Sequence, residues 1–163
     1  MARIAFECRS EIAASAERIH AELAAPERQL GLQPLLIAVE PQPAAPEDAA
    51  GVRRFDAVER VPLFGPFALR NRIRVTVTPD PGGRRVDFHA RSRGAIEVES
   101  RFDLEPRAGE ATLVRERVEL RVPAWLGPFV EKRAAAAQAA LLANLKHRLE
   151  AETPPGPAPG KTG

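Results

Sequence analysis

Glu116 is the side chain whose position in this sequence most favours chemistry. It lies between Val114 and Val118 in a segment that alternates apolar and polar residues, on the side that is otherwise apolar. A carboxylate on a buried face is costly unless it is paired or hydrogen-bonded, and burial raises its pKa toward neutrality. Glu116 could then act as a general acid or anchor a ligand. The alternatives are a structural ion pair with an arginine, or a local bulge that turns the side chain outward.

Asn71 and Ser100 occupy comparable inward positions in two other segments. The Asn71 amide could orient a ligand carbonyl or hydroxyl group, or it could bond to buried backbone. Ser100 weighs less, because a hydroxyl group is easily satisfied by local hydrogen bonds. Beyond these residues, the chain has no Gly-x-Ser-x-Gly elbow and no glycine-rich phosphate loop, and no two of its three histidines have metal-ligand spacing. We therefore predict no metal site and no cofactor.

The elements that must position these side chains are strands. Between Leu35 and Val122 most segments alternate apolar and polar residues, most clearly in 69–78. The predicted strands are 4–8, 35–40, 69–78, 85–91, 96–104 and 112–122. Short connections between the later strands predict an antiparallel meander with one buried and one hydrated face.

Helical spacing occurs near both ends of the chain. Ser15 can cap a first helix, and Pro26 can open a second short turn that ends at Gly31. From Trp125 onward, one apolar stripe predicts a long helix, with Gln138 largely off the stripe. The stripe consists of Val130, Ala134, Ala137, Leu141 and Leu145. Because its middle is alanine, either this helix packs very close to the sheet or space remains between them.

Arginines dominate the outer face of the predicted meander, where they could bind phosphates. They include Arg70, Arg72, Arg74, Arg85, Arg91, Arg115, Arg117 and Arg121. Carboxylates share that face, which favours cross-strand ion pairs: Asp87, Glu97, Glu99, Asp103 and Glu119. No aromatic residue lies there to stack on bases, so we predict no nucleic-acid partner.

Two apolar segments fit neither a strand nor a helix interior. They are LFGPF at 63–67 and WLGPF at 125–129, and each contains a Gly-Pro kink flanked by aromatic residues. One hypothesis is that they form the entrance to a cavity, where they rest transiently on a membrane or a partner protein. The entrance residues would be Phe64, Phe67, Trp125 and Phe129. The alternative is that they plug one end of the core.

The length of 163 residues fits one domain, which we place at 1–150, followed by a disordered Pro/Gly-rich tail at 151–163. The 24 lysines and arginines face 22 carboxylates, so the net charge of +2 argues only weakly for a polyanionic partner. Cys8 is the single cysteine, which excludes an internal disulfide. With no signal-peptide core and no run of about 18 apolar residues, a cytoplasmic location is expected.

The order of these elements over 1–150 resembles the helix-grip fold of the START and Bet v 1 superfamily, also called SRPBCC or polyketide cyclase-like proteins. The stretches VERVPLFGPFALRNRIRV, 58–75, and VPAWLGPF, 122–129, are similar in style to small bacterial members. The resemblance implies an α+β fold in which a curved antiparallel sheet of six to seven strands wraps around a long C-terminal helix, with short helices after the first strand. It also implies a cavity between sheet and helix, in a superfamily of lipid carriers, hormone receptors, aromatases and cyclases.

We therefore predict a non-catalytic binding or carrier protein whose cavity holds a lipid-like or aromatic molecule, with the oligomeric state left open. Asn71 and Glu116 would be polar anchors, and Ser100 would lie beside them. The predicted apolar walls are Val75, Phe88, Val98, Phe102, Val118, Val130, Ala137 and Leu141. One alternative is a polyketide cyclase or aromatase in which Glu116 moves a proton. Another is a regulatory or chaperone-like module that binds protein through the outer sheet or the entrance loops.

Overall fold

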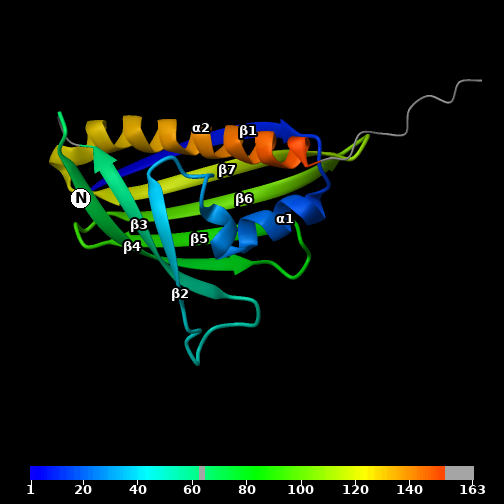
Figure 1. Cartoon of the computed structure of the whole chain (residues 1–163), viewed down its shortest axis with the longest axis horizontal. Coiled ribbons are helices and arrows are strands. Elements are labelled where there is room, and N and C mark those ends of the chain that lie inside the picture. The colour runs from blue at the N-terminus through cyan, green and yellow to red at the C-terminus, as the bar shows by residue number, and fades with distance from the viewer. Residues whose placement is uncertain (63–64, 153–163) are drawn as a thin grey trace, which may run out of the picture.

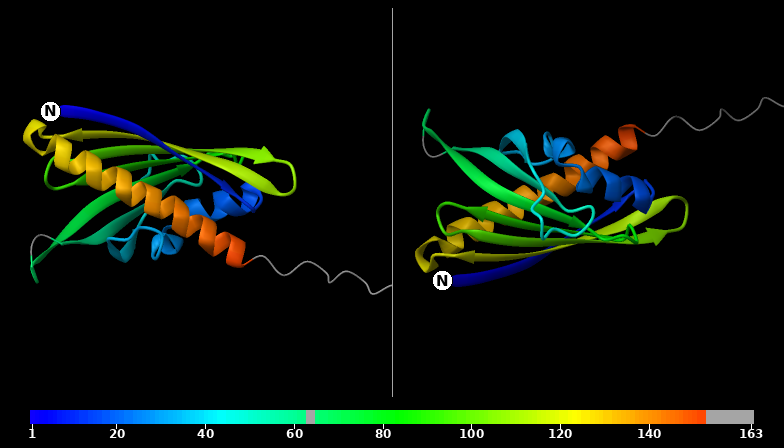
Figure 2. Two further views of the ribbon diagram at one scale, coloured as in Figure 1. Left: turned by 90° about the horizontal axis from the view of Figure 1, so that it is seen from above. Right: turned by 90° about the horizontal axis from the view of Figure 1, so that it is seen from below.

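The computed structural model describes residues 1–62 and 65–152, which form one antiparallel sheet and a long helix laid across it (Figure 1). The strands are β1 (Ala2–Ile12), β2 (Leu36–Gln42), β3 (Arg53–Pro62), β4 (Ala68–Pro79), β5 (Arg85–Ser92), β6 (Glu97–Arg107) and β7 (Ala111–Val122). The helices are α1 (Ala16–Ala24), the short 3-10 turns η1 (Pro26–Gln29) and η2 (Ala124–Leu126), and α2 (Gly127–Ala151). Figure 2 shows α2 running diagonally over the sheet. The predicted α+β helix-grip class is confirmed.

The strand order in the sheet is β1-β7-β6-β5-β4-β3-β2. β1 pairs with β7 in one unbroken register, from Ala2 opposite Val122 to Ile12 opposite Thr112. Along β7 every second residue from Thr112 to Val122 is buried, so a register slip would move all of these side chains to the solvent face. The six strands predicted from alternation are present, and β3 is a seventh that was not delimited.

The helix starts follow the predicted capping chemistry. The Ser15 hydroxyl accepts a hydrogen bond of 3.3 Å from the backbone N–H of Arg18 at the start of α1. The η1 turn begins at Pro26, and Gly31 follows with a φ of +83°, which only glycine adopts without strain. At the other end, α2 ends at Ala151, one residue beyond the domain boundary that the sequence predicts. Of the predicted tail, residues 151 and 152 are described, and 153–163 lie outside the described residues.

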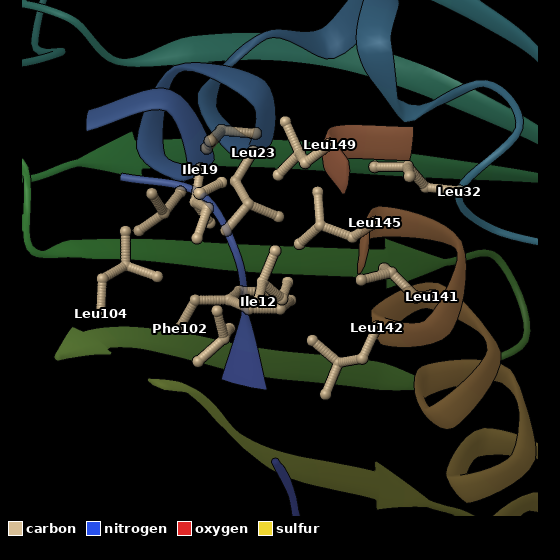
Figure 3. Close-up of a cluster of buried hydrophobic side chains, with 14 of the residues drawn as sticks. Ile12, Ile19, Leu23, Leu32, Phe102, Leu104, Leu141, Leu142, Leu145 and Leu149 are labelled. Carbon is tan, nitrogen blue, oxygen red and sulfur yellow. The ribbon is translucent and has the colours of Figure 1, made fainter. Parts of the chain in front are cut away.

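The densest part of the apolar core lies under the second half of α2 (Figure 3). Leu141, Leu142, Leu145 and Leu149 of α2 pack there against α1 and the sheet. Their partners include Ile12, Ile19, Leu23, Leu32, Phe102 and Leu104. The first half of α2 has no leucine, and α2 lies closest to β1 at the sheet edge. The helix is therefore anchored at its C-terminal end.

The outer face of the sheet carries cross-strand ion pairs. Arg72 contacts Glu40 at 2.6 Å and Asp56 at 3.1 Å, and Arg101 contacts Asp87 at 2.7 Å. These pairs confirm the ion-pairing interpretation of the arginine-rich face, although each exposed pair adds little stability. None of the described helices is long and apolar enough to cross a membrane.

Candidate functional site

A cavity of about 300 Å³ lies between the sheet and the first half of α2. Its walls come from β2 to β7, from the η1 region and from α2. The helix contributes Val130, Ala134 and Ala137, which are too small to fill the space over a curved sheet. Of the two arrangements that the alanine stripe allows, the structure therefore has the open one.

All eleven residues that the sequence predicts as ligand-binding line this cavity. The sheet supplies Asn71, Val75, Phe88, Val98, Ser100, Phe102, Glu116 and Val118, and α2 supplies Val130, Ala137 and Leu141. The Phe88 and Phe102 rings meet edge to face, with centroids 5.5 Å apart. Their contact with a ligand remains a prediction, but the structure brings them to one site.

Glu116 is the most deeply placed polar group of the cavity. Its side chain is fully buried, and its Oε1 accepts a hydrogen bond of 2.6 Å from the Ser100 hydroxyl. Its Oε2 has no hydrogen-bond partner, and Glu116 forms no ion pair with any described residue. Burial raises the pKa of Glu116 to about 7, and the Ser100 hydrogen bond opposes that rise. The structural ion pair and the outward bulge are therefore both wrong for this residue.

A second carboxyl group lines the cavity, and the sequence analysis missed it. Glu59 on β3 lies directly opposite Asn71 on β4, and the Asn71 side chain hydrogen-bonds to it. Burial raises the pKa of Glu59, while the hydrogen bond with Asn71 lowers it. The signal was present, because Phe55, Ala57, Glu59 and Val61 alternate along β3 and all line the cavity. Asn71 thus bonds to a side chain and not to buried backbone.

Polar groups from two elements face each other at the side of the cavity. The Gln33 amide donates a hydrogen bond of 3.2 Å to Oε1 of Gln138, and both residues line the cavity. The prediction that Gln138 lies largely off the inner stripe of the helix is therefore wrong. The reason is that the helix backbone comes closest to β1 at the sheet edge, so a wider arc of the helix surface faces the cavity.

Arg133 joins the start of α2 to the end of β3 beside the cavity. Its guanidinium group lies 4.9 Å from the centroid of the Phe129 ring, and its Nη1 donates a hydrogen bond of 3.4 Å to the Pro62 carbonyl. Both Arg133 and Phe129 line the cavity. The sequence predicts Phe129 at the entrance but does not single out Arg133.

The predicted entrance residues that the structure describes are exposed. Trp125 keeps 80% of its surface accessible, Phe67 keeps 61%, and Phe129 keeps 57%. Side chains that plug a core would be buried, so these values disagree with the plug alternative. Phe64 lies outside the described residues.

One cluster with metal-ligand chemistry lies on the outer face of the sheet. His89, Glu97 and Glu99 bring one ligand atom each to within 4.8 Å of one another. Oε1 of Glu97 already lies 2.7 Å from Nε2 of His89 and 2.8 Å from the Arg91 guanidinium. We assign the cluster to the ion pairing of this face, because Glu97 is already matched by its neighbours.

With this geometry in place, the family can be identified. The sequence model of the family described as polyketide cyclase / dehydrase and lipid transport matches residues 3–150. The chain belongs to this family. Its cavity is therefore that of a START and polyketide cyclase-like ligand-binding domain. No curated protein resembles the chain closely enough in sequence to count as a relative.

Solved structures share the fold of this polyketide cyclase-like chain at low sequence identity. A START superfamily protein from Mycobacterium smegmatis is 19% identical, with a TM-score of 0.73 over 91% of this chain and 99% of that one. The Zhui aromatase/cyclase from a Streptomyces species is 14% identical, with a TM-score of 0.70 over 91% and 94%. Norcoclaurine synthase from Thalictrum flavum, in complex with dopamine and hydroxybenzaldehyde, is 15% identical, with a TM-score of 0.67 over 94% and 90%.

Proposed function

We propose that this protein binds a small hydrophobic molecule, lipid-like or aromatic, in the cavity and carries it without changing it chemically. The observation that carries the proposal is one buried, unpartnered carboxyl oxygen, Oε2 of Glu116, in a largely apolar cavity. The apolar walls would supply affinity through removal of ligand surface from water. The carboxyl group would fix the orientation of the ligand.

The chemistry of Glu116 limits the polar group that its ligand carries. A buried polar atom without a partner costs about 1–3 kcal/mol, which a ligand hydrogen bond would recover. With a pKa of about 7, Glu116 can accept a bond from a hydroxyl group when ionised or donate one to a carbonyl group when protonated. An oxygen-bearing hydrophobic molecule therefore fits the site better than a pure hydrocarbon.

The described lining residues favour binding over covalent catalysis. They include no cysteine, histidine or lysine, so the usual nitrogen and sulfur nucleophiles are missing from the described lining. The titratable groups of this lining are Glu116, Glu59 and Arg133. The cavity itself also argues against the third prediction, a protein-binding module, which would be expected to have a filled interior.

The second candidate function is a cyclase or aromatase reaction, and one observation favours it. A carboxyl group with a pKa of about 7 in an apolar pocket is suited to take up and release a proton near neutral pH. The family description includes polyketide cyclases, and the Zhui structure shares this fold. In that case Glu116 would move the proton while the walls hold a reactive chain in a folded shape.

Native mass spectrometry of protein purified from its own cells tests the first proposal. A retained small molecule of hydrophobic character would support it and would name the ligand class. A fluorescent hydrophobic probe, N-phenylnaphthylamine, then tests the site, because Ala137→Leu should reduce probe binding and the exposed Ala136→Leu should not. Equal probe binding by the two variants, with no co-purified molecule, would contradict the proposal.

Glu116→Gln separates the carrier from the enzyme. Glutamine keeps the shape and hydrogen-bonding capacity of the side chain but cannot exchange a proton. A carrier should retain its molecule when this variant is purified from the same cells. An enzyme should retain binding but lose turnover of a poly-β-ketone substrate by at least about a hundredfold.

A further inference from the structure

The exposed apolar side chains of the described residues gather at one end of the molecule. Seven large ones are exposed: Met1, Leu30, Ile37, Phe67, Leu69, Trp125 and Phe129. Four of them lie at the β3–β4 connection and at the β7–α2 connection, and we name these four the apolar rim: Phe67, Leu69, Trp125 and Phe129. Exposed apolar side chains that lie together on one surface mark a site of interaction.

The topology of the sheet places both parts of the apolar rim at one end of the molecule. β3 ends, β4 begins, β7 ends and α2 begins at the same end of the molecule (Figures 1 and 2). Arg133 connects two parts of this end, because it stacks on Phe129 and donates a hydrogen bond to Pro62. Leu69 lies opposite Val61 in the β3–β4 pair, beside Pro62. Residues far apart in the sequence are thus brought to the same end of the molecule.

Exposed cations lie at the same end of the molecule as the apolar rim. Arg60, Arg70, Arg93 and Lys132 are exposed on β3, β4, the β5–β6 turn and α2, and none forms an ion pair with a described residue. Arg60 lies directly opposite Arg70, a like-charge pair that a protein surface normally avoids. The exposed carboxylate among them on α2 is Glu131. Farther from the mouth, Arg72 is neutralised by Glu40 and Asp56.

We propose that this end of the protein docks on an anionic lipid bilayer. The apolar rim would enter the headgroup region, and Arg60, Arg70, Arg93 and Lys132 would face the lipid phosphates. Exposed aromatic side chains next to unpaired cations are the combination that binds a membrane surface. In this orientation the cavity mouth faces the lipid. The proposal goes beyond ligand binding and does not depend on which molecule fills the cavity.

The chain carries its own reporter for this test, because Trp125 is its only tryptophan and belongs to the apolar rim. The full-length protein is mixed with vesicles of phosphatidylcholine, with or without phosphatidylglycerol, and bound protein is measured by flotation. We expect binding only to vesicles that contain phosphatidylglycerol, a shift of Trp125 emission to shorter wavelength, and release at high salt. Equal binding to both vesicle types, or unchanged Trp125 emission on bound vesicles, would overturn the proposal.

Matched variants separate docking at this surface from two general effects, which are a change in net charge and the loss of an exposed apolar side chain. Arg60→Glu combined with Arg70→Glu should lower the vesicle partition coefficient about tenfold or more. Arg74→Glu changes an exposed, unpaired arginine of the same strand, roughly 13 Å farther along β4, and should have little effect. Likewise Trp125→Ser should weaken flotation, whereas Ile37→Ser, an exposed apolar residue on β2, should not.

All of these positions are exposed, so the variants should keep the melting temperature of the parent protein. Loss of vesicle binding in the control variants to the same extent as in the rim variants would refute the proposal. So would rim variants that bind as the parent does. Absence of binding to any vesicle would also refute it and would leave the surface to an acidic partner protein.

Discussion

The Ser100 hydroxyl reaches Glu116 diagonally across two neighbouring strands and holds only one of its two carboxyl oxygens. Ser100 lies opposite Val118 in the β6–β7 pair, and Phe102 lies opposite Glu116, so the 2.6 Å bond crosses the register. Oε2 has no partner among the described residues, in a side chain that lines the cavity. The hydrogen bond from Ser100 therefore fixes the orientation of a carboxyl group that still has one free acceptor.

The first prediction concerns the pH dependence of stability. The pKa of Glu116 is raised from an ordinary 4.5 to about 7 on folding, so the folded chain binds a proton that the unfolded chain releases. Its stabilising contribution is fully present below pH 4.5 and is lost as the pH rises through 7. The loss amounts to about 3 kcal/mol, or roughly 6–12 °C in melting temperature. Calorimetry from pH 4 to pH 8 measures it.

Glu116→Gln supplies the reference for that titration. Glutamine does not titrate. The difference in unfolding free energy between parent and variant therefore contains the titration of Glu116 and cancels that of every group that the substitution leaves unchanged. If this difference in unfolding free energy stays constant from pH 4 to pH 8, the Glu116 carboxyl group keeps its ordinary pKa on folding and the prediction is wrong.

The second prediction concerns the hydrogen bond itself. Ser100→Ala removes the one group that lowers the pKa of Glu116, so that pKa should rise further above 7. Loss of the bond should cost about 1 kcal/mol of unfolding free energy. A carbon-detected NMR titration of the Glu116 carboxyl group follows the change. Ser92→Ala, which lines the cavity but does not bond to Glu116, should leave the titration where it is; an equal shift in both variants would disprove the link.

The third prediction concerns the space under α2. Ala137→Leu adds three carbon atoms at the cavity wall, so the apolar volume should be filled with a melting temperature equal to or above that of the parent. Overpacking of a filled core would instead cost about 1–3 kcal/mol. Thermal unfolding of Ala137→Leu beside the exposed Ala136→Leu decides the matter, because a marked loss confined to Ala137→Leu means that no room exists there.

The fourth prediction concerns the mouth. Phe129→Ser should slow uptake of N-phenylnaphthylamine several-fold while it leaves the melting temperature within a few degrees, since the ring is 57% exposed. Stopped-flow fluorescence gives the rate. Phe102→Ser, by contrast, removes a ring that is 2% exposed and should cost about 3–5 kcal/mol. A destabilisation of that size for Phe129→Ser would make it a core residue and not an entrance residue.

Alternation was sufficient to predict the sheet wherever one face is uniformly apolar. β7 was predicted in full because Val114, Val118, Leu120 and Val122 mark the buried face around Glu116. β3 was not delimited, because Glu59 interrupts its inner face just before the apolar segment that starts at Val61. A polar residue on the inner face of a clearly predicted strand, such as Glu116, indicates a candidate site. The same kind of residue in a strand with a weak pattern, such as Glu59, hides the strand itself.

The sequence pattern alone did not decide whether a cavity exists, because that depends on how elements distant in the sequence pack together. The alanine stripe of α2 fits both a tight and an open arrangement, and the choice follows from where the leucines of the second half anchor the helix. Arg133 shows the same limit, because its role comes from contacts with Phe129 and with Pro62, which is distant in the sequence. Length and charge of a side chain do not indicate which distant element it reaches.

The unequal anchoring of α2 has a dynamic consequence. Its second half buries Leu141, Leu142, Leu145 and Leu149, whereas its first half packs on the sheet through the smaller Val130 and Ala134, beside the cavity. Backbone amides around Val130 should exchange their hydrogens with solvent sooner than those around Leu145, because less buried surface must be exposed to release them. Local opening at this end would widen the lumen, so we expect the protein to accept molecules larger than its resting volume while the rest of the fold stays intact.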